Sequence, residues 1–283
     1  MICSPSPYPY LASQAGRTGQ VTLLGAPLDR TGSFRAGCAE GPTGIRWASE
    51  NLETYSPHLD RDLEDITLGD LGDLDLAGLS QTDALAYIEQ EVGALLDAGT
   101  LPFVLGGEHT IALAIARAVL ARHANAWILQ LDAHADLRDS YLDEPLSHAT
   151  WAYRVGETYG FDRLVQLGIR SGLRDEFKLG RARSAFFNEG LMLPAALRAK
   201  FASRPLYITL DLDVLDPCHA PGTGTPEAGG ISYRQLIAFL DSLAGLHVVA
   251  LDINEVAPPL DPTGATSAIA AKLVREMVLL FNR

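Results

Sequence analysis

The strongest constraint on the fold is a repeated alternation between short apolar runs and longer stretches of helical periodicity. The apolar runs occupy residues 20–27, 102–107, 126–132, 163–169, 206–213 and 247–253, with a weaker one at 65–72. Helical spacing of apolar residues fills the gaps, at about 81–98, 108–122, 147–157, 191–201, 232–244 and 265–281. Strand followed by helix, repeated, predicts βαβ units and a mostly parallel sheet with helices on both faces.

The apolar runs alternate little between apolar and polar residues, as expected for strands that are covered on both faces. This favours a doubly wound α/β sandwich, although periodicity alone leaves a closed barrel open. In either architecture, ligands bind at the carboxyl ends of the strands. The polar residues that follow each strand are therefore the ones to examine for a site.

The chain has no long linker, so we expect a single domain at 17–283, preceded by a flexible Pro- and Ser-rich tail at 1–16. No apolar run reaches the ~18 residues of a membrane span, and the start lacks a signal-peptide pattern. The three cysteines, Cys3, Cys38 and Cys218, are widely spaced and odd in number, which favours reduced thiols. We therefore expect a cytoplasmic protein.

The balance of charge restricts the class of partner. Lysine and arginine total 22 against 35 aspartate and glutamate residues, which gives a net charge of −13. An acidic surface argues against nucleic acid or an anionic membrane as a partner. It is compatible with cationic substrates or metal ions.

Ionisable side chains follow four of the apolar runs directly. They are Glu108 and His109 after FVLGG, Asp132, His134 and Asp136 after ILQL, Asp211 and Asp213 after YITL, and Asp252 and Glu255 after VVAL. Burying so many carboxylates without compensation would cost several kcal/mol each, or would force them to take up protons. Because these motifs contain no lysine or arginine, we expect metal ions to compensate the charge.

The spacing and type of these residues indicate which metal they would bind. In an extended backbone, the alternate positions of D-x-H-x-D and D-x-D place their side chains on one side. Four aspartates and two histidines form an oxygen-rich set that favours Mn(II), with Fe(II), Co(II) and Zn(II) as competitors. Six ligands are too many for one tetrahedral site but suit two ions that share bridging carboxylates.

Two further residues are candidates for catalysis or binding. His148 follows a polar, acidic loop after the D-x-H-x-D motif, which favours a role in proton transfer. Glu255 lies beyond a strand end and before a Pro-Pro turn, where it could hold a cationic substrate. The Gly- and Pro-rich loop at 216–230 is expected to form part of the active-site rim.

Four segments resemble the signatures of the ureohydrolases, the arginase and agmatinase superfamily: GGEHT, LDAHADLRDSYLDEPLSHAT, TLDLDVLDPCHAPGTGTPEAGG and DINEVAPPLDPTGATSAIAA. The resemblance spans about residues 20–281. It implies a three-layer αβα sandwich around an eight-stranded, mostly parallel sheet. It also implies a binuclear manganese centre with two Mn²⁺ per subunit, hydrolysis of a guanidino group to urea and an amine, and a homotrimer or homohexamer.

The resemblance also assigns roles by position. One Mn²⁺ would be bound by His109, Asp132, Asp136 and Asp211, and the other by Asp132, His134, Asp211 and Asp213. A hydroxide bridging the metals would attack the guanidinium carbon, with Asp136 as its hydrogen-bond partner. Glu255 would pair with the guanidinium, and His148 would pass a proton to the leaving amine.

The loop between Asp136 and His148 is expected to select the substrate. Its acidic residues Asp139, Asp143 and Glu144 would repel a carboxylate, and it lacks the Ser-Gly-Asn of arginases. This favours agmatine, which yields putrescine in polyamine biosynthesis, with Asp139 and Glu144 as expected substrate contacts. Arginine and guanidinobutyrate stay open as alternatives, because Arg138 or Arg174 could reach a carboxylate.

Two other classes of protein compete with this interpretation. A zinc amidohydrolase of the deacetylase type resembles this fold but keeps a single metal, whereas His109, Asp136 and Asp213 favour two. A non-catalytic, metal-binding regulatory subunit is expected to have lost a ligand or His148, and none is missing here.

Overall fold

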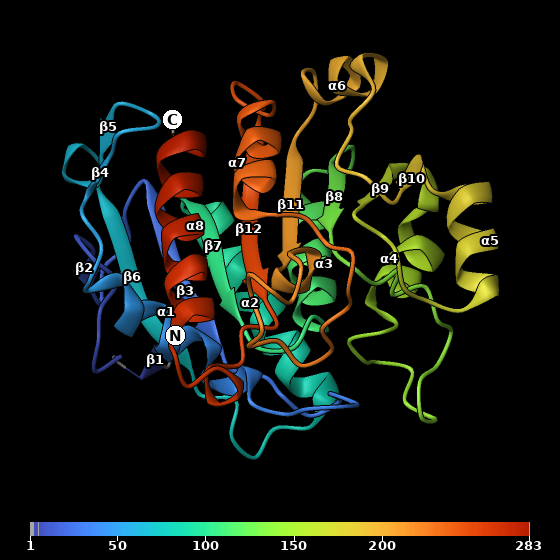
Figure 1. Ribbon diagram of the computed structural model, residues 1–283, viewed down its shortest axis with the longest axis horizontal. Coiled ribbons are helices and arrows are strands. Elements are labelled where there is room, and N and C mark those ends of the chain that lie inside the picture. The colour runs from blue at the N-terminus through green and yellow to red at the C-terminus, as the bar shows by residue number, and fades with distance from the viewer. Residues whose placement is uncertain (1–2, 5, 283) are drawn as a thin grey trace.

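The computed structural model describes residues 3–4 and 6–282, and in this part of the chain eight parallel strands form the centre of the fold (Figure 1). Their order across the sheet is β6-β3-β7-β12-β11-β8-β9-β10. They are β3 (Val21–Ala26), β6 (Leu68–Leu74), β7 (Leu101–Gly106), β8 (Trp127–Leu131), β9 (Leu164–Leu167), β10 (Phe186–Asn188), β11 (Leu206–Asp211) and β12 (Val248–Asn254). The sheet is open at both edges, which excludes the closed barrel.

Helices cover both faces of this sheet. They are α1 (Gly41–Ser49), α2 (Gln81–Asp97), α3 (Ile111–Arg122), α4 (Trp151–Tyr159), α5 (Arg174–Arg183), α6 (Ala195–Phe201), α7 (Tyr233–Asp241) and α8 (Ala265–Phe281). Short 3-10 turns are η1 (Cys38–Glu40), η2 (Leu63–Asp65), η3 (Phe161–Arg163), η4 (Leu212–Val214) and η5 (Pro258–Leu260), and β4 (Tyr55–Ser56) pairs with β5 (Arg61–Asp62).

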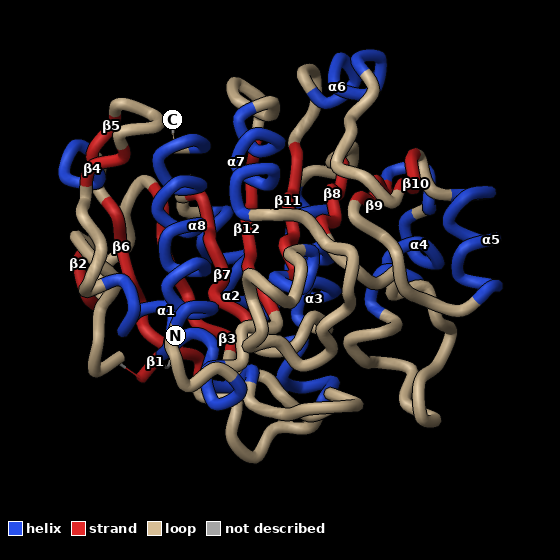
Figure 2. Tube along the Cα trace, in the orientation of Figure 1, coloured by secondary structure: helices blue, strands red, loops and turns tan. Residues whose placement is uncertain are grey.

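Two hydrophobic cores separate the layers. One lies between the sheet and α1, α6, α7 and α8, and the other between the sheet and α2, α3 and α4 (Figures 1 and 2). Neighbouring strand residues point alternately into the two cores, as Leu23 and Leu24 of β3 do. Both faces of the central strands are thus buried, and this explains the continuous apolar runs. The predicted three-layer αβα sandwich with eight parallel strands is confirmed.

All seven predicted strands and all six predicted helices are present. The sequence analysis missed α1, α5 and β10, as well as the strands of only two residues. The α1 segment is only nine residues long and contains two glycines and a proline, which disfavour a helix, and α5 is mostly charged and shows few apolar residues. The β10 strand has only three residues, too few to show periodicity.

The N-terminal segment differs from the flexible tail expected at 1–16. Strands β1 (Cys3–Ser4) and β2 (Gln14–Ala15) pair with β6, and Tyr10 between them is 1% exposed. The Tyr10 hydroxyl donates to the Ala271 carbonyl at 2.7 Å. Residues 1, 2 and 5 lie outside the described residues. Strand pairing and the buried Tyr10 side chain together fix the segment, and the Pro- and Ser-rich composition does not reveal such contacts.

Two other expectations concern cysteines and membranes. Cys38 is buried and Cys218 exposed, and both are free thiols, whereas the side chain of Cys3 lies outside the described part. Among the described residues, no helix combines the length and the apolar character that crossing a bilayer requires.

Candidate metal centre

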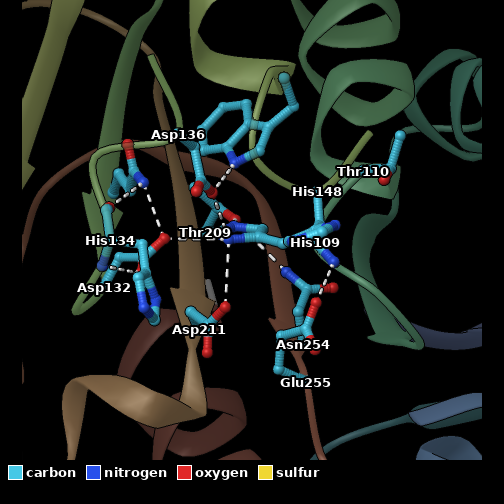
Figure 3. A network of polar contacts seen from close by, with 12 residues as sticks. His109, Thr110, Asp132, His134, Asp136, His148, Thr209, Asp211, Asn254 and Glu255 are labelled. Carbon is cyan, nitrogen blue, oxygen red and sulfur yellow. Dashed lines mark hydrogen bonds and ion pairs between the residues drawn. The ribbon is translucent and has the colours of Figure 1, made fainter. Parts of the chain in front are cut away.

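The strand order brings the acidic motifs together at one edge of the sheet. His109 follows β7, Asp132 follows β8 and Asp211 ends β11, while Asp213 lies in the η4 turn. Because these strands run parallel in the order β7-β12-β11-β8, their carboxyl ends meet at the same edge. Figure 3 shows the resulting cluster, with carboxylates arranged around the His109 ring.

The first group of candidate ligands surrounds Nδ1 of His109, which is fully buried. This nitrogen lies 3.0 Å from Asp132 Oδ2, 3.3 Å from Asp136 Oδ2 and 3.3 Å from Asp211 Oδ2. It has no hydrogen-bond partner within the described chain. A buried nitrogen that faces three carboxylate oxygens without bonding to any of them suits a shared cation.

The second group lies beside the first and shares Asp132 with it. Nδ1 of His134 lies 2.9 Å from Asp213 Oδ2 and 3.8 Å from Asp132 Oδ1. His109, Asp132 and Asp211 can hold one ion, and Asp132, His134 and Asp213 can hold another. Asp211, which the resemblance implies as a second bridge, belongs to the first group only.

The local backbone differs from the extended form considered for these motifs. The chain leaves β8 after Leu131, and Asp136 adopts a left-handed conformation with φ +51°. Asp211 accepts from the Asp213 N–H at 2.9 Å and so begins the tight η4 turn. Turns, rather than the pleat of a strand, therefore bring these side chains together.

A chain of hydrogen bonds fixes which nitrogen of His109 faces the carboxylates. Thr209 of β11 donates its hydroxyl hydrogen to Asp252 Oδ1 at 2.7 Å, and lies 2.8 Å from His109 Nε2. With its hydrogen donated to Asp252, Thr209 accepts from Nε2, which must carry the ring hydrogen. Nδ1 then keeps a lone pair for a metal, and this arrangement is typical of metal-binding histidines.

Asp136 has its own support. Trp151, at the start of α4, donates its indole N–H to Asp136 Oδ2 at 2.7 Å. The Trp151 ring also packs against His109, with ring centroids 4.9 Å apart. Trp151 therefore holds two members of the first group in place.

The electrostatics of the cluster also call for a cation. Burial raises the pKa of Asp211 well above its usual value, and the neighbouring Asp213 and Asp132 raise it further. Burial, followed by the Asp132 charge, likewise raises the pKa of Asp136. In the protein alone these carboxyls would tend to take up protons, and a bound divalent cation would reverse that tendency. The oxygen-rich donor set thus fits a hard or borderline metal ion.

A cavity of about 160 Å³ opens onto this cluster. Its charged and aromatic lining residues are His134, Asp136, Arg138, Tyr141, His148 and Glu176. Glu255 is not among the described residues that line this cavity; its Oε1 accepts from the backbone N–H of His109 at 2.7 Å (Figure 3). Burial raises the pKa of Glu255 to about 8, against the effect of that hydrogen bond.

Residues 19–280 match the model of the arginase family. The chain belongs to this family. An agmatinase of Bacillus anthracis is 42% identical to it over 264 residues, which cover 92% of this chain and 91% of that protein. A guanidinobutyrase of Pseudomonas aeruginosa is 34% identical, covering 90% of this chain and 84% of that one. The crystal structure of an agmatine ureohydrolase of Thermoplasma volcanium is 30% identical with a TM-score of 0.86, covering 98% and 94%.

Two of the predicted substrate contacts lie away from the cavity of this arginase-family chain. The Asp139 side chain is 75% exposed and pairs with Arg154. Glu144 Oε1 accepts from the Leu146 N–H at 3.0 Å. Neither residue is among the described residues that line the cavity. Asp139 and Glu144 are thus each paired with another group of the chain, an arginine of α4 and a backbone N–H.

Besides Asp136, a second acidic residue lines the cavity: Glu176 of α5, which the sequence analysis missed. Its Oε1 accepts from the Leu137 N–H at 3.0 Å, and its Oε2 from the Leu173 N–H at 2.7 Å. Nε of Arg138 lies 3.3 Å from Oε2. Glu176 lies within a charged helix segment, where nothing in the sequence distinguishes it from its neighbours. Thr209 and Trp151 were missed for the same reason, since each resembles an ordinary core residue.

Proposed function

We propose that this chain is a manganese-dependent agmatinase that hydrolyses agmatine to putrescine and urea, with two Mn²⁺ per subunit. The observation that carries the proposal is the pair of His/Asp groups that share Asp132 beside a cavity of about 160 Å³. The agmatinase of Bacillus anthracis and the agmatine ureohydrolase of Thermoplasma volcanium support the choice of reaction.

Six residues would hold the two ions. They are His109, Asp132, Asp136, Asp211, His134 and Asp213. Bound ions of this kind lower the pKa of a coordinated water and so supply hydroxide near neutral pH. The chain's part is to fix the ligands, and the Thr209 and Trp151 hydrogen bonds do so.

The remaining roles belong to residues that would touch the substrate. Glu255 offers a buried carboxyl group whose charged form a bound guanidinium would stabilise, and Asp136 offers an oxygen that can accept a hydrogen bond from the attacking nucleophile. His148 lines the cavity, and burial lowers the pKa of its imidazole. A neutral ring near pH 7 can take up a proton and pass it to the leaving amine.

The residues that line the cavity also indicate which group they can bind at the end of the substrate opposite the guanidinium. Arg138 is already held by Glu176 at 3.3 Å, and its guanidinium lies 4.6 Å from the centre of the Tyr141 ring. An arginine with these partners is poorly available to a substrate carboxylate. Glu176 Oε1, by contrast, accepts from the Leu137 N–H and keeps a second lone pair that can accept from a cationic amine. This favours agmatine. Guanidinobutyrate is the second candidate, because Arg138 would bind its carboxylate if it left Glu176.

A substrate panel tests the proposal. Manganese-loaded protein, with bound metal counted, should release urea from agmatine with the highest kcat/KM among agmatine, arginine and 4-guanidinobutyrate. Asp132→Asn should abolish the activity, while Asp143→Asn, in an exposed part of the loop, should keep it. A rate with arginine or 4-guanidinobutyrate that exceeds the agmatine rate tenfold would overturn the choice of substrate. One bound metal per subunit would overturn the binuclear centre.

We also propose that the protein is cytoplasmic and forms a homotrimer or homohexamer that binds neither nucleic acid nor membrane. The net charge of −13 supports the absence of anionic partners. Light scattering on the purified protein gives the number of subunits, and a monomer would contradict the oligomer.

A further inference from the structure

Glu108, of the GGEHT segment, is fully buried yet does not belong to the groups that can hold a metal. Its Oε2 accepts from the Arg30 and Thr31 N–H groups, both at 2.6 Å. Its Oε1 accepts from the hydroxyls of Thr31 at 3.0 Å and Thr110 at 2.7 Å, and from the Gln81 amide at 3.1 Å. Because all five partners donate, Glu108 is held as a carboxylate that only accepts.

The Thr31 hydroxyl links this carboxylate to His148. Its oxygen lies 3.0 Å from Glu108 Oε1, 3.1 Å from the His148 backbone nitrogen and 3.2 Å from His148 Nδ1. A hydroxyl has one hydrogen to donate and two lone pairs that accept. The His148 backbone N–H can only donate, so it occupies one lone pair.

The position of the Thr31 hydroxyl hydrogen then decides which nitrogen of the His148 ring carries a hydrogen. A hydrogen bond to a carboxylate is stronger than one to a neutral nitrogen, so the hydroxyl hydrogen goes to Glu108. The second lone pair of Thr31 is left to face Nδ1, which must therefore carry a hydrogen. All three bonding positions of the Thr31 hydroxyl are then used. The Thr110 hydroxyl lies 3.3 Å from the Thr31 oxygen but donates its own hydrogen to Glu108 at 2.7 Å, so it does not compete for these positions.

We propose that Glu108 and Thr31 act as positioning residues that hold His148 with its hydrogen on Nδ1 and leave Nε2 free to exchange a proton in the cavity. The Tyr141 ring packs edge-on against the imidazole from another side, with centroids 5.4 Å apart, and restricts its rotation. The catalytic consequence rests on the proposed function, because it requires His148 to serve the leaving amine. The assignment of the ring hydrogen does not depend on the reaction.

Neutron diffraction of the deuterated, manganese-loaded protein at pH 8 tests the assignment directly. Deuterium should be found on Nδ1 of His148, and the Thr31 deuterium should point at Glu108. Deuterium on Nε2, with Nδ1 bare and the Thr31 deuterium aimed at it, would overturn the proposal. This measurement needs no substrate, so its result stands even if wild-type protein releases no urea from agmatine. A failure of the wild-type protein to release urea from agmatine would count against the proposed function alone.

Kinetics test the catalytic consequence. Thr31→Val removes the hydroxyl and should lower kcat for agmatine about 10- to 100-fold, with KM changed less than threefold, since general acid-base catalysis contributes about 10²–10⁴. Thr31→Ser keeps the hydroxyl and should restore most of kcat. Thr110→Val removes a different hydroxyl that donates to Glu108, and it should lower kcat less than Thr31→Val does. Equal losses in the Thr31→Val and Thr31→Ser variants, at wild-type metal content and Tm, would refute a role for the hydroxyl.

Discussion

Thr209→Val is expected to weaken metal binding without disturbing the fold. Thr209 lies within a central strand, where valine has nearly the same shape and an equal preference for extended backbone. The change removes the acceptor of the His109 Nε2–H, which lies 2.8 Å from the Thr209 oxygen in a fully buried position. The ring then loses the hydrogen bond that directs Nδ1 toward the carboxylates.

The magnitude follows from the cost of a buried donor without a partner, about 1–3 kcal/mol. At about 1.4 kcal/mol per factor of ten, this corresponds to a loss of roughly 5- to 150-fold in metal affinity. Loss of a partner behind a metal ligand typically costs about 10- to 100-fold, in agreement with that range. We therefore expect a loss of about 10- to 100-fold for Thr209→Val.

Competition with a chelator measures this prediction. Metal dissociation constants of wild-type, Thr209→Val and Thr209→Ser protein are compared at one pH, and Tm is recorded for each metal-free form. Thr209→Ser keeps the hydroxyl and should stay within about threefold of wild type, because the bond to His109 is kept. An affinity of Thr209→Val within twofold of wild type would refute the reasoning that the Thr209 bond orients His109.

Three further predictions concern metal removal, substrate choice and stability. Dialysis against a chelator should lower Tm, and added Mn²⁺ should restore it. Ions that bind only the folded state stabilise it by about 2.7 kcal/mol when their concentration is 100 times Kd. An unchanged Tm would contradict metal binding at the cluster. Glu176→Gln should lower kcat/KM for agmatine about tenfold and raise the rate with 4-guanidinobutyrate relative to agmatine, because it frees Arg138. If urea-release assays show the same ratio of these two rates as in wild type, Glu176 is not the contact for the amine. Arg46→Met should lower the free energy of unfolding by about 3–5 kcal/mol, measured by denaturant titration, because it leaves Asp70 buried without its cation at 2.8 Å. Asp73→Asn, at a partly exposed partner of the same arginine, should cost less.

The sequence was a good guide to the elements that build the sheet and to the residues at their ends. Continuous apolar runs arise because both strand faces are buried, so β3, β7, β8, β11 and β12 could be located closely. A parallel sheet places the carboxyl ends of its strands at one edge. This is why His109, Asp132 and Asp211 were expected to meet, and the structure brings their ligand atoms within 4.8 Å of one another.

The same approach is less informative for residues whose role depends on a distant partner. Asp139 and Glu144 were expected to contact the substrate because of their charge, but Arg154 and a backbone N–H already satisfy them. Glu176 has an ordinary place in a charged helix, yet its carboxylate lines the cavity. Charge in a sequence shows that a partner is needed, and only the fold shows which partner is near.

The sequence by itself determined the alternation of strands and helices and the set of side chains gathered at the strand ends, because both follow from local periodicity and from the geometry of parallel strands. Periodicity left the choice between an open sandwich and a closed barrel to the family resemblance and to the structure. Only the tertiary structure decided how those side chains are held. His109 meets Thr209, 100 residues later in the chain, and Thr31 meets His148, 117 residues later. Such pairs depend on the order in which strands assemble and on loop conformation, which no local pattern encodes. The physical reason is that a hydrogen bond requires two atoms to lie about 3 Å apart, and that proximity arises only when the whole sheet has formed.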